Sequence, residues 1–382
     1  MAAAASPLLP PSVQHLFDPR SVLSHMLFDE YVFRLTLHVV RATGLDAAPR
    51  QWLTVDDLVA KAGLEPRRSV VPVSWMLRHL ASRGVFACDD GRFMADGALP
   101  AVDAAEVLAA QKLHDAGCLP SYSVAEAAAR DYPAFLRGER TGEEVLLAPA
   151  RLPLWTHYFS NDNALYAVNN RVGAAALERW TNGGATTILE LGGGLGSGTA
   201  AVLERLSAAG RLDTVAAYRF TELVRGFLRR AQRVAERFPG VPLTFGVLDI
   251  DRPFGEQDVR PASVSIVYAV NTLHVANDLA FTLREIRRAL TPGGQLIISE
   301  CVRPRPGQTV YPEFVFNLME TFRAPQLHAE YRPNGGFLTP EQWSAALDAA
   351  GFTDVRTFPD IARIRDVVRE FDVAAIGATS TP

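Results

Sequence analysis

The 382-residue sequence is poor in cysteine and lysine, and its net charge is small. Cys88, Cys118 and Cys301 lie far apart and match no metal-ligand spacing, so we expect no metal site and a reducing compartment. Lysine occurs only at positions 61 and 112. The net charge of −4 argues against nucleic acid and against an anionic membrane surface as partners.

The sequence also lacks long hydrophobic runs. No segment approaches the roughly 20 apolar residues of a membrane span. The N-terminus has neither the basic start nor the continuous apolar region of a secretion signal. We therefore expect a cytoplasmic protein with no membrane partner. Its 48% hydrophobic and 21% charged residues are ordinary for a globular protein, and the length allows two domains with a sizeable core.

The N-terminal part is predicted to be mainly helical. Residues 1–20 have the composition of a loose arm, and apolar residues recur at helical spacing over 22–43. Thr54 is the expected N-cap of a short helix, which is followed by a second helix over 70–83 and a hairpin over 85–94. This order is typical of a winged-helix unit. The second helix carries too few basic or amide side chains to read DNA, so we expect a packing or dimerisation role.

From residue 186 onwards, short apolar strands alternate with helices. The expected strands are 186–191, 214–220, 242–248, 263–270, 294–300, 353–358 and 371–377, and the expected helices among the first five strands are 197–208, 224–238 and 278–290. The alternation over the first five strands predicts an α/β fold with a parallel sheet covered on both faces, and the last two strands complete a Rossmann-like, seven-stranded sheet. We divide the chain into a winged-helix, dimerisation-type domain (1–100), a helical linker that covers cofactor and substrate (101–180) and a cofactor-binding domain (181–382).

The segment from Ile188 to Ser197 is the most informative part of the sequence. An apolar strand carries Glu190 near its end and is followed by Gly192, Gly194 and Gly196, then by a helix-forming segment. Glycines at a strand-to-helix turn let a ligand approach the backbone closely, because no side chain blocks it. A glycine turn alone does not name the ligand.

Polar groups follow the neighbouring strands as well. The second strand ends in Glu222, which could accept hydrogen bonds from both hydroxyls of a ribose. The third ends in Asp249 and Ile250, where the carboxylate could hold an exocyclic amine, and the fourth ends in Asn271. Ligands of doubly wound sheets bind at the carboxyl ends of the strands. The ordered set therefore predicts a nucleoside site.

Residues 186–300 resemble class I S-adenosylmethionine-dependent methyltransferases. The run from Glu190 to Gly196 matches that family's ExGxGxG strand-turn motif. The resemblance implies S-adenosylmethionine as cofactor, with its methionine part beside Gly192, Gly194 and Gly196, its ribose on Glu222 and its adenine near Asp249. A nicotinamide dehydrogenase would also use Glu222. However, Ser197 stands where its GxGxxG motif requires the third glycine.

His274 follows the fourth strand, and Glu300 ends the fifth at the same edge of the sheet. Histidine titrates near neutrality, so His274 is the expected base that removes a proton from the acceptor. Glu300 would hold the imidazole in the useful tautomer. The alternative is that His274 only caps the loop and Glu300 pairs with an arginine.

Resemblance extends to two kinds of methyltransferase. The segment from Asn271 to Glu300 is similar to the C-methyltransferase domains of polyketide synthases, where a histidine and a glutamate at these positions deprotonate an acidic carbon. The winged-helix start and the glycine turn resemble small-molecule O-methyltransferases. Those enzymes carry a Leu-His-Asp-Trp motif, of which this sequence has Leu-His but not Asp-Trp. Carbon and oxygen both remain open. No carrier or synthase domain is attached, so we expect a free, polyketide-like or aromatic natural product as acceptor.

Two aromatic segments, 151–171 and 303–337, are the candidates for the acceptor pocket. The residues selected from them are Trp155, Tyr158, Tyr166, Asn170, Phe316, Met319 and Phe322. Because the first helices are apolar, we expect a homodimer through residues 1–110. A second hypothesis is a winged-helix regulator whose methyltransferase domain only senses a ligand. A gel shift at physiological salt separates the two hypotheses.

Overall fold

The structure is a computed structural model that describes residues 6–47, 50–95, 97–181, 184–369 and 371–381. It divides into two units. Unit 1 comprises the N-terminal segment ending at Pro19, Phe159–Pro306 and Pro325 onwards, and unit 2 comprises Arg20–Tyr158 and Gly307–Ala324. These units differ from the three consecutive domains expected from the sequence, because each unit contains segments that are distant in the chain.

Unit 2 is mainly helical. Its main elements are α3 (Pro19–Thr43, which begins at the last residue of unit 1), β1 (Leu53–Thr54), α4 (Val55–Lys61), α5 (Pro66–Ser82), β2 (Phe86–Asp89), β3 (Arg92–Ala95), α6 (Ala104–His114), α7 (Leu119–Leu136), α8 (Gly142–Leu146), α9 (Leu152–Tyr158), α15 (Glu313–Phe316) and α16 (Glu320–Arg323). Thr54 caps α4 in a reciprocal capping box with Asp57, as expected. The predicted helix, helix and hairpin are present, and their identity as a winged-helix unit stays a prediction.

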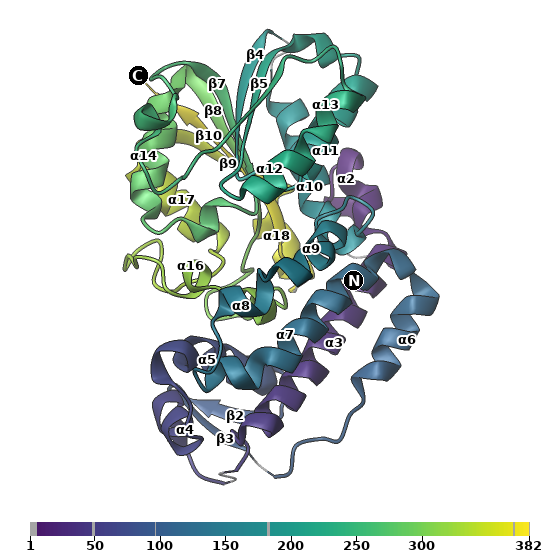
Figure 1. The fold of residues 1–382 in the computed structure, drawn as a ribbon, viewed down its shortest axis with the longest axis vertical. Coiled ribbons are helices and arrows are strands. Elements are labelled where there is room, and N and C mark those ends of the chain that lie inside the picture. Colours follow the sequence, from purple (N-terminus) through teal and green to yellow (C-terminus); the bar gives the residue numbers. More distant parts are fainter. Residues whose placement is uncertain (1–5, 48–49, 96, 182–183, 370, 382) are drawn as a thin grey trace. The chain divides into compact units, whose positions relative to one another are not determined.

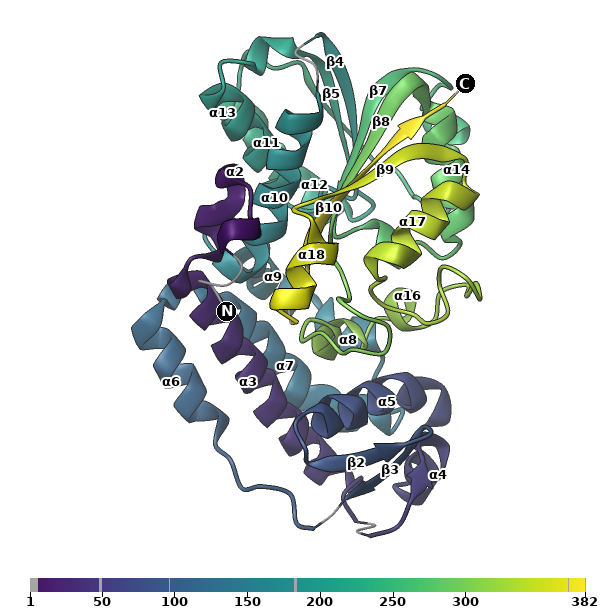
Figure 2. The same ribbon diagram turned by 180° about the vertical axis from the view of Figure 1, so that it is seen from behind.

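The core of unit 2 joins its long helices to the segment 307–324. Helices α3 and α7 lie side by side (Figures 1 and 2), and the rings of Tyr31 and Tyr122 are 4.6 Å apart. Tyr132 of α7 donates a hydrogen bond to the carbonyl oxygen of Phe314 at 2.7 Å. The indole nitrogen of Trp75 donates to the buried carboxylate of Glu313 at 2.8 Å. Residues from the C-terminal half of the chain thus complete the helical unit.

Unit 1 is built on a sheet in which, among the described residues, seven strands pair in the order β6-β5-β4-β7-β8-β10-β9. The strands are β4 (Thr186–Leu191), β5 (Val215–Thr221), β6 (Leu243–Gly246), β7 (Val264–Val270), β8 (Leu290–Cys301), β9 (Phe352–Phe358) and β10 (Val373–Ser380). The predicted seven-stranded α/β sheet is confirmed. The five strands that the alternation predicted to be parallel, β4 to β8, are parallel, and β10 runs antiparallel to both β8 and β9. It returns between them after the short helix α18 (Ile361–Val367).

Helices cover both faces of this sheet (Figure 1), as predicted. One face carries α10 (Ala164–Trp180), α11 (Ser197–Ala208), α12 (Arg225–Ala231) and α13 (Arg233–Arg237), and the other carries α14 (Leu279–Ala289) and α17 (Pro340–Ala349). Central strand residues such as Leu189, Tyr268 and Ile297 are fully buried between the two layers. Within the described ranges, no helix is both long and apolar enough to cross a membrane.

The N-terminal segment is not a loose arm. Residues 11–14 form the short helix α2, flanked by single 3-10 turns. Leu9, Val13, Leu16 and Phe17 are buried in the core of unit 1, and the ring of Phe17 lies 4.7 Å from that of Phe371. The expectation is wrong for residues 6–19 because these four apolar side chains find a surface on α10 and near the last strand. Residues 1–5, which the same expectation included, lie outside the described residues.

Candidate functional site

The glycine turn between β4 and α11 is closed on one side and open on the other. Gly192, Gly194 and Gly196 all have positive φ, at 59°, 58° and 86°. A Cβ on Gly192 would lie 2.4 Å from Thr272, and one on Gly193 would lie 2.2 Å from the ring of Phe220. A Cβ on Gly194 would meet no atom within 4 Å. A Cβ on Gly196 would lie 2.8 Å from Val234, so the turn packs against the protein at three positions and offers open space at Gly194.

Glu222, at the end of β5, is fixed beside this turn. Its Oε2 accepts a hydrogen bond from the backbone N–H of Gly194 at 2.9 Å, and its Oε1 accepts one from Val224 at 2.7 Å. Burial raises the pKa of this carboxyl above its usual value. An ordered carboxylate next to an open glycine backbone fits a cofactor with a ribose and a methionine moiety. The residues present therefore fit S-adenosylmethionine.

Gly194→Ala should fold and lose cofactor affinity, because the added methyl group enters the open space at the turn. The positive φ of this residue adds a cost of about 1–2 kcal/mol to folding. Gly193→Ala should instead impair folding, since its Cβ would overlap Phe220. Thermal unfolding and calorimetry with S-adenosylhomocysteine measure both effects. Wild-type affinity in Gly194→Ala would show that the open space is not where the cofactor binds.

Glu190 lies beneath the turn and is only 1% exposed. Its Oε2 accepts hydrogen bonds from the hydroxyls of Thr199, at 2.5 Å, and Tyr218, at 2.8 Å. Burial raises the pKa of Glu190 to about 7, against these hydrogen bonds, which lower it. The carboxyl group is therefore half-protonated near neutral pH in the ligand-free protein.

This raised pKa predicts a specific pH dependence of stability. The folded protein binds the Glu190 proton more tightly than the unfolded chain, so the stabilisation is complete below about pH 4.5 and is lost as the pH rises through about 7. The free energy of unfolding of wild type relative to Glu190→Gln should fall by on the order of 3 kcal/mol over this range. Denaturant titrations at several pH values measure it. Glu204→Gln, an exposed change on α11, should show no such trend, and the same trend there would contradict the assignment to Glu190.

The other predicted cofactor residues end the next strands. Asp249 is half-buried, and its backbone N–H and C=O are both paired with the side-chain amide of Gln257, at 2.7 and 2.9 Å. Ile250 is also half-buried. Asn271 has a φ of 48°, and its side-chain oxygen accepts from Cys301 at 2.8 Å. Asn271 therefore ties the end of β7 to β8, and contact between these three residues and the cofactor stays a prediction.

His274 and Glu300 form a direct, buried pair. The Nδ1 of His274 lies 2.6 Å from Oε2 of Glu300. Glu300 is fully buried, and its Oε1 accepts from the backbone N–H groups of Thr272 and Leu273, at 3.2 and 3.0 Å. The carboxylate is thus engaged by the loop of the histidine itself, contrary to the alternative in which it pairs with an arginine. His274 is 5% exposed and lies against Phe337, with ring centroids 4.7 Å apart.

This geometry selects one form of the imidazole. A carboxylate that already accepts two N–H groups accepts a third from Nδ1–H, so the neutral ring carries its proton on Nδ1. The other nitrogen, Nε2, then keeps its lone pair and is able to act as a base. The tautomer of His274 is thus assigned from the hydrogen bonds that Glu300 accepts.

The predicted acceptor residues fall into two sets. Trp155, Tyr158, Phe316 and Phe322 form an aromatic cluster in unit 2, with neighbouring ring centroids 5.4–6.5 Å apart, and the half-buried Met319 belongs to the same unit. Tyr166 and Asn170 lie on α10 in unit 1, where the side chain of Asn170 donates to that of Asn161 at 2.8 Å. Asn161 in turn donates to the carbonyl of Ser197, in the first turn of α11. The role of both sets in binding an acceptor stays a prediction.

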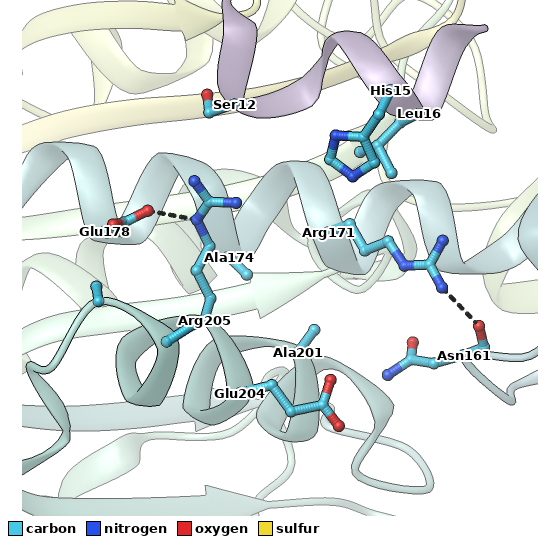
Figure 3. Close-up of a pocket in the computed structure, with 12 residues that line it drawn as sticks. Ser12, His15, Leu16, Asn161, Arg171, Ala174, Glu178, Ala201, Glu204 and Arg205 are labelled. Atoms are coloured by element: carbon cyan, nitrogen blue, oxygen red, sulfur yellow. Dashed lines mark hydrogen bonds and ion pairs between the residues drawn. The ribbon is translucent and has the colours of Figure 1, made fainter.

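Unit 1 also contains a cavity of about 440 Å³ (Figure 3). It is lined by the N-terminal segment, α10 and α11, and includes an ion pair between Glu178 and Arg205. Neither the glycines of the turn nor His274 or Glu300 lines it.

Sequence reasoning missed the groups that support the loop of His274. Arg332 donates to the carbonyl oxygens of His274 and Ala276, and Asp251 accepts from the backbone N–H of Asn277 at 2.7 Å. Asp251 was visible as a second acid after the third strand. Arg332 carries no local signal, because nothing near it in the sequence distinguishes it from the many other arginines.

The chain is similar to known methyltransferases in sequence and in fold. A family model described as a methyltransferase domain matches residues 189–296. The polyketide synthase ThaG of Burkholderia thailandensis is 31% identical over 251 residues, which are 64% of this chain and 4% of that protein. The highly reducing polyketide synthase valA of Aspergillus terreus is 30% identical over 229 residues, 58% of this chain and 9% of that protein. The chain thus spans less than a tenth of the length of these relatives.

Solved structures match nearly the whole chain. The CurJ carbon methyltransferase has a TM-score of 0.79 at 22% identity, covering 100% of this chain and 99% of that one. The CMeT domain of the citrinin polyketide synthase has a TM-score of 0.71 at 17% identity, covering 98% of both chains. The trans-methyltransferase CalH, solved with S-adenosylhomocysteine, has a TM-score of 0.65 at 22% identity, covering 94% and 91%. Residues 189–296 therefore match a methyltransferase domain model, and the chain has the fold of the carbon methyltransferase CurJ and of the CMeT domain of the citrinin polyketide synthase.

Proposed function

We propose that this chain transfers the methyl group of S-adenosylmethionine to an acidic carbon of a small polyketide-like acceptor. The observation that carries this proposal is the buried pair of His274 and Glu300, 2.6 Å apart, at the strand edge that holds the glycine turn and Glu222. A carbon next to carbonyl groups becomes a nucleophile only when its proton is removed. A histidine oriented by a carboxylate supplies that step.

Two residues bind the cofactor in this proposal, and two others remove the proton. Gly194 and Glu222 would hold the cofactor, which supplies an activated methyl group on its sulfonium. Nε2 of His274 takes the proton from the acceptor carbon, and Glu300 stabilises the imidazolium that forms. The bound cofactor would supply its methyl group to this carbon, and the electrons of the sulfur–methyl bond would stay on sulfur. Fixing these groups in line lowers the barrier by roughly 7–11 kcal/mol relative to the reaction in solution.

Carbon is favoured over oxygen as the methylated atom on two grounds. The relatives are polyketide synthases by name, and the solved neighbours include carbon methyltransferases. The residues after His274 are Val275-Ala-Asn, which depart from the Leu-His-Asp-Trp motif of the O-methyltransferases. The relatives lend no support to a winged-helix regulator, and we do not propose one.

The homodimer expected from the apolar first helices belongs to this proposal. One face of α3 packs against α7 within the same chain, so that face needs no partner. Leu23 and Met26 on α3 and Leu113 on α6 remain exposed, at 41%, 51% and 91%, and support a contact between two chains. Light scattering should give twice the mass of one chain. The mass of a single chain would refute the dimer.

The function is tested with a defined acceptor. The protein is incubated with S-adenosylmethionine and a small 3-oxoacyl thioester, whose C2 proton lies between two carbonyl groups. We expect a product heavier by one methylene group, with NMR placing the new methyl on C2. The control is the same thioester already carrying two methyl groups on C2, which should not react. A product methylated on oxygen, or none despite bound S-adenosylhomocysteine, would overturn the carbon assignment.

A further inference from the structure

The loop that carries His274 is held by an arginine from a distant part of the chain. The side chain of Arg332 is 1% exposed. Its two terminal nitrogens donate to the carbonyl oxygens of His274, at 2.6 Å, and Ala276, at 2.5 Å. Burial lowers the pKa of Arg332 to about 10, against the raising effect of nearby Asp251 and Asp278, so the guanidinium remains charged at neutral pH.

Arg332 is itself held in place. Its backbone N–H and C=O exchange hydrogen bonds with those of His328, both at 2.9 Å. The rings of His328 and Tyr331 stack at a centroid distance of 3.8 Å. The backbone N–H of Gln326 donates to the carbonyl of Asn277 at 2.9 Å. Residues 326–332, which we name the brace, therefore contact the histidine loop through both main chain and side chain.

Together with Glu300 and Asp251, the brace engages much of the polar backbone of this loop. Glu300 accepts from the N–H groups of residues 272 and 273, and Asp251 accepts from that of residue 277. Arg332 and Gln326 supply the donors for the carbonyls of residues 274, 276 and 277. The orientation of the peptide groups at residues 274–276 sets the direction of the His274 side chain. Arg332 thus binds the carbonyl of His274 itself.

We infer that Arg332 is a positioning residue for His274: its guanidinium clamps the carbonyls of His274 and Ala276 and so directs Nε2 of the imidazole toward the acceptor carbon. This inference rests on the proposed role of His274 as base. Planar parallel donors suit two neighbouring carbonyls, and a lysine ammonium does not reproduce that geometry. A displacement of about 1 Å at a reacting group can cost about 10²-fold in rate.

The test combines kinetics with a direct view of the imidazole. Arg332→Gln should lower kcat about 10²-fold while the KM of the acceptor and the affinity for S-adenosylhomocysteine stay at the wild-type values. The kcat of Arg332→Lys, which keeps the charge and part of the hydrogen bonding, should lie between those of wild type and Arg332→Gln. If Arg332→Gln does not fold, Arg332→Lys replaces it in both measurements. In ligand-free, 15N-histidine-labelled protein, the His274 nitrogen signals should shift in Arg332→Gln. His274→Asn assigns those signals by their loss.

Arg211 offers a matched control. It also donates two hydrogen bonds to carbonyls, those of Glu178 at 2.9 Å and Thr181 at 3.0 Å, remote from the His274 loop. Arg211→Gln should change thermal stability without changing kcat or the His274 signals. Unchanged kcat and His274 signals in both Arg332 variants would overturn the inference. If His274→Asn stays active, the proposed base is wrong, and the nitrogen signals alone then decide whether Arg332 orients the imidazole.

Discussion

His274→Asn should lower kcat by about 10²–10⁴-fold, the usual contribution of a general base. Asparagine can still donate an amide N–H toward Glu300, so the buried carboxylate keeps a partner and the loop keeps its shape. What is lost is the Nε2 lone pair that accepts the acceptor's proton. Methyl transfer is measured with saturating S-adenosylmethionine.

Affinity for S-adenosylhomocysteine should be unchanged in His274→Asn, because Gly194 and Glu222 are untouched. His38→Asn is the control, since His38 is an exposed histidine on α3 of unit 2 and should retain wild-type turnover. Wild-type kcat in His274→Asn would mean that positioning of the two reactants suffices and that no base is needed. The methyltransferase assignment would survive that result, and the proton-removal step would not.

Glu300→Gln should be comparably damaging for a different reason. The amide oxygen would keep the hydrogen bonds from Thr272 and Leu273, and the amide NH₂ group would then face Nδ1 of His274. Two donors cannot share one hydrogen bond, so the imidazole is driven to the tautomer with its proton on Nε2. In a catalytic triad, the same kind of change costs about 10⁴-fold in kcat. We expect a loss of about 10³-fold or more.

The tautomer change in Glu300→Gln is visible directly by 15N NMR of labelled histidine. Nδ1 of His274 should change from a protonated to an unprotonated nitrogen, and Nε2 should change in the opposite sense. Glu285→Gln is the matched control, because Glu285 is also a buried glutamate of unit 1, on α14, bonded to a backbone N–H at 2.7 Å. A shared loss of stability with normal turnover in both variants would contradict the orienting role of Glu300.

The sheet and the candidate site were largely predictable because they depend on local patterns. The strands and helices between residues 186 and 301 lie within a few residues of their predicted positions. One difference is the expected helix over 224–238, which is divided into α12 and α13 at Gln232. The carboxyl ends of neighbouring parallel strands share one edge, so Glu190, Glu222 and Glu300 were predicted together without knowledge of any contact.

Other features could not be predicted, because they depend on contacts between residues far apart in the chain. Phe17 meets Phe371, and Phe314 meets Tyr132. The segment 307–324 belongs to unit 2 although it interrupts unit 1 in the sequence. None of these partners leaves a periodic or spaced pattern, which explains why residues 6–19 were wrongly expected to form a loose arm.

The amino-acid pattern alone determined the α/β sheet and the glycine turn, and it placed a histidine and a glutamate at one sheet edge. These follow from the period of apolar residues and from the rule that strand ends gather functional groups. Tertiary structure decided which imidazole nitrogen is bonded to Glu300 and which arginine, of the many in the chain, supports the loop. Both depend on hydrogen bonds at 2.5–3.2 Å between segments 26–58 residues apart, and only folding creates such distances.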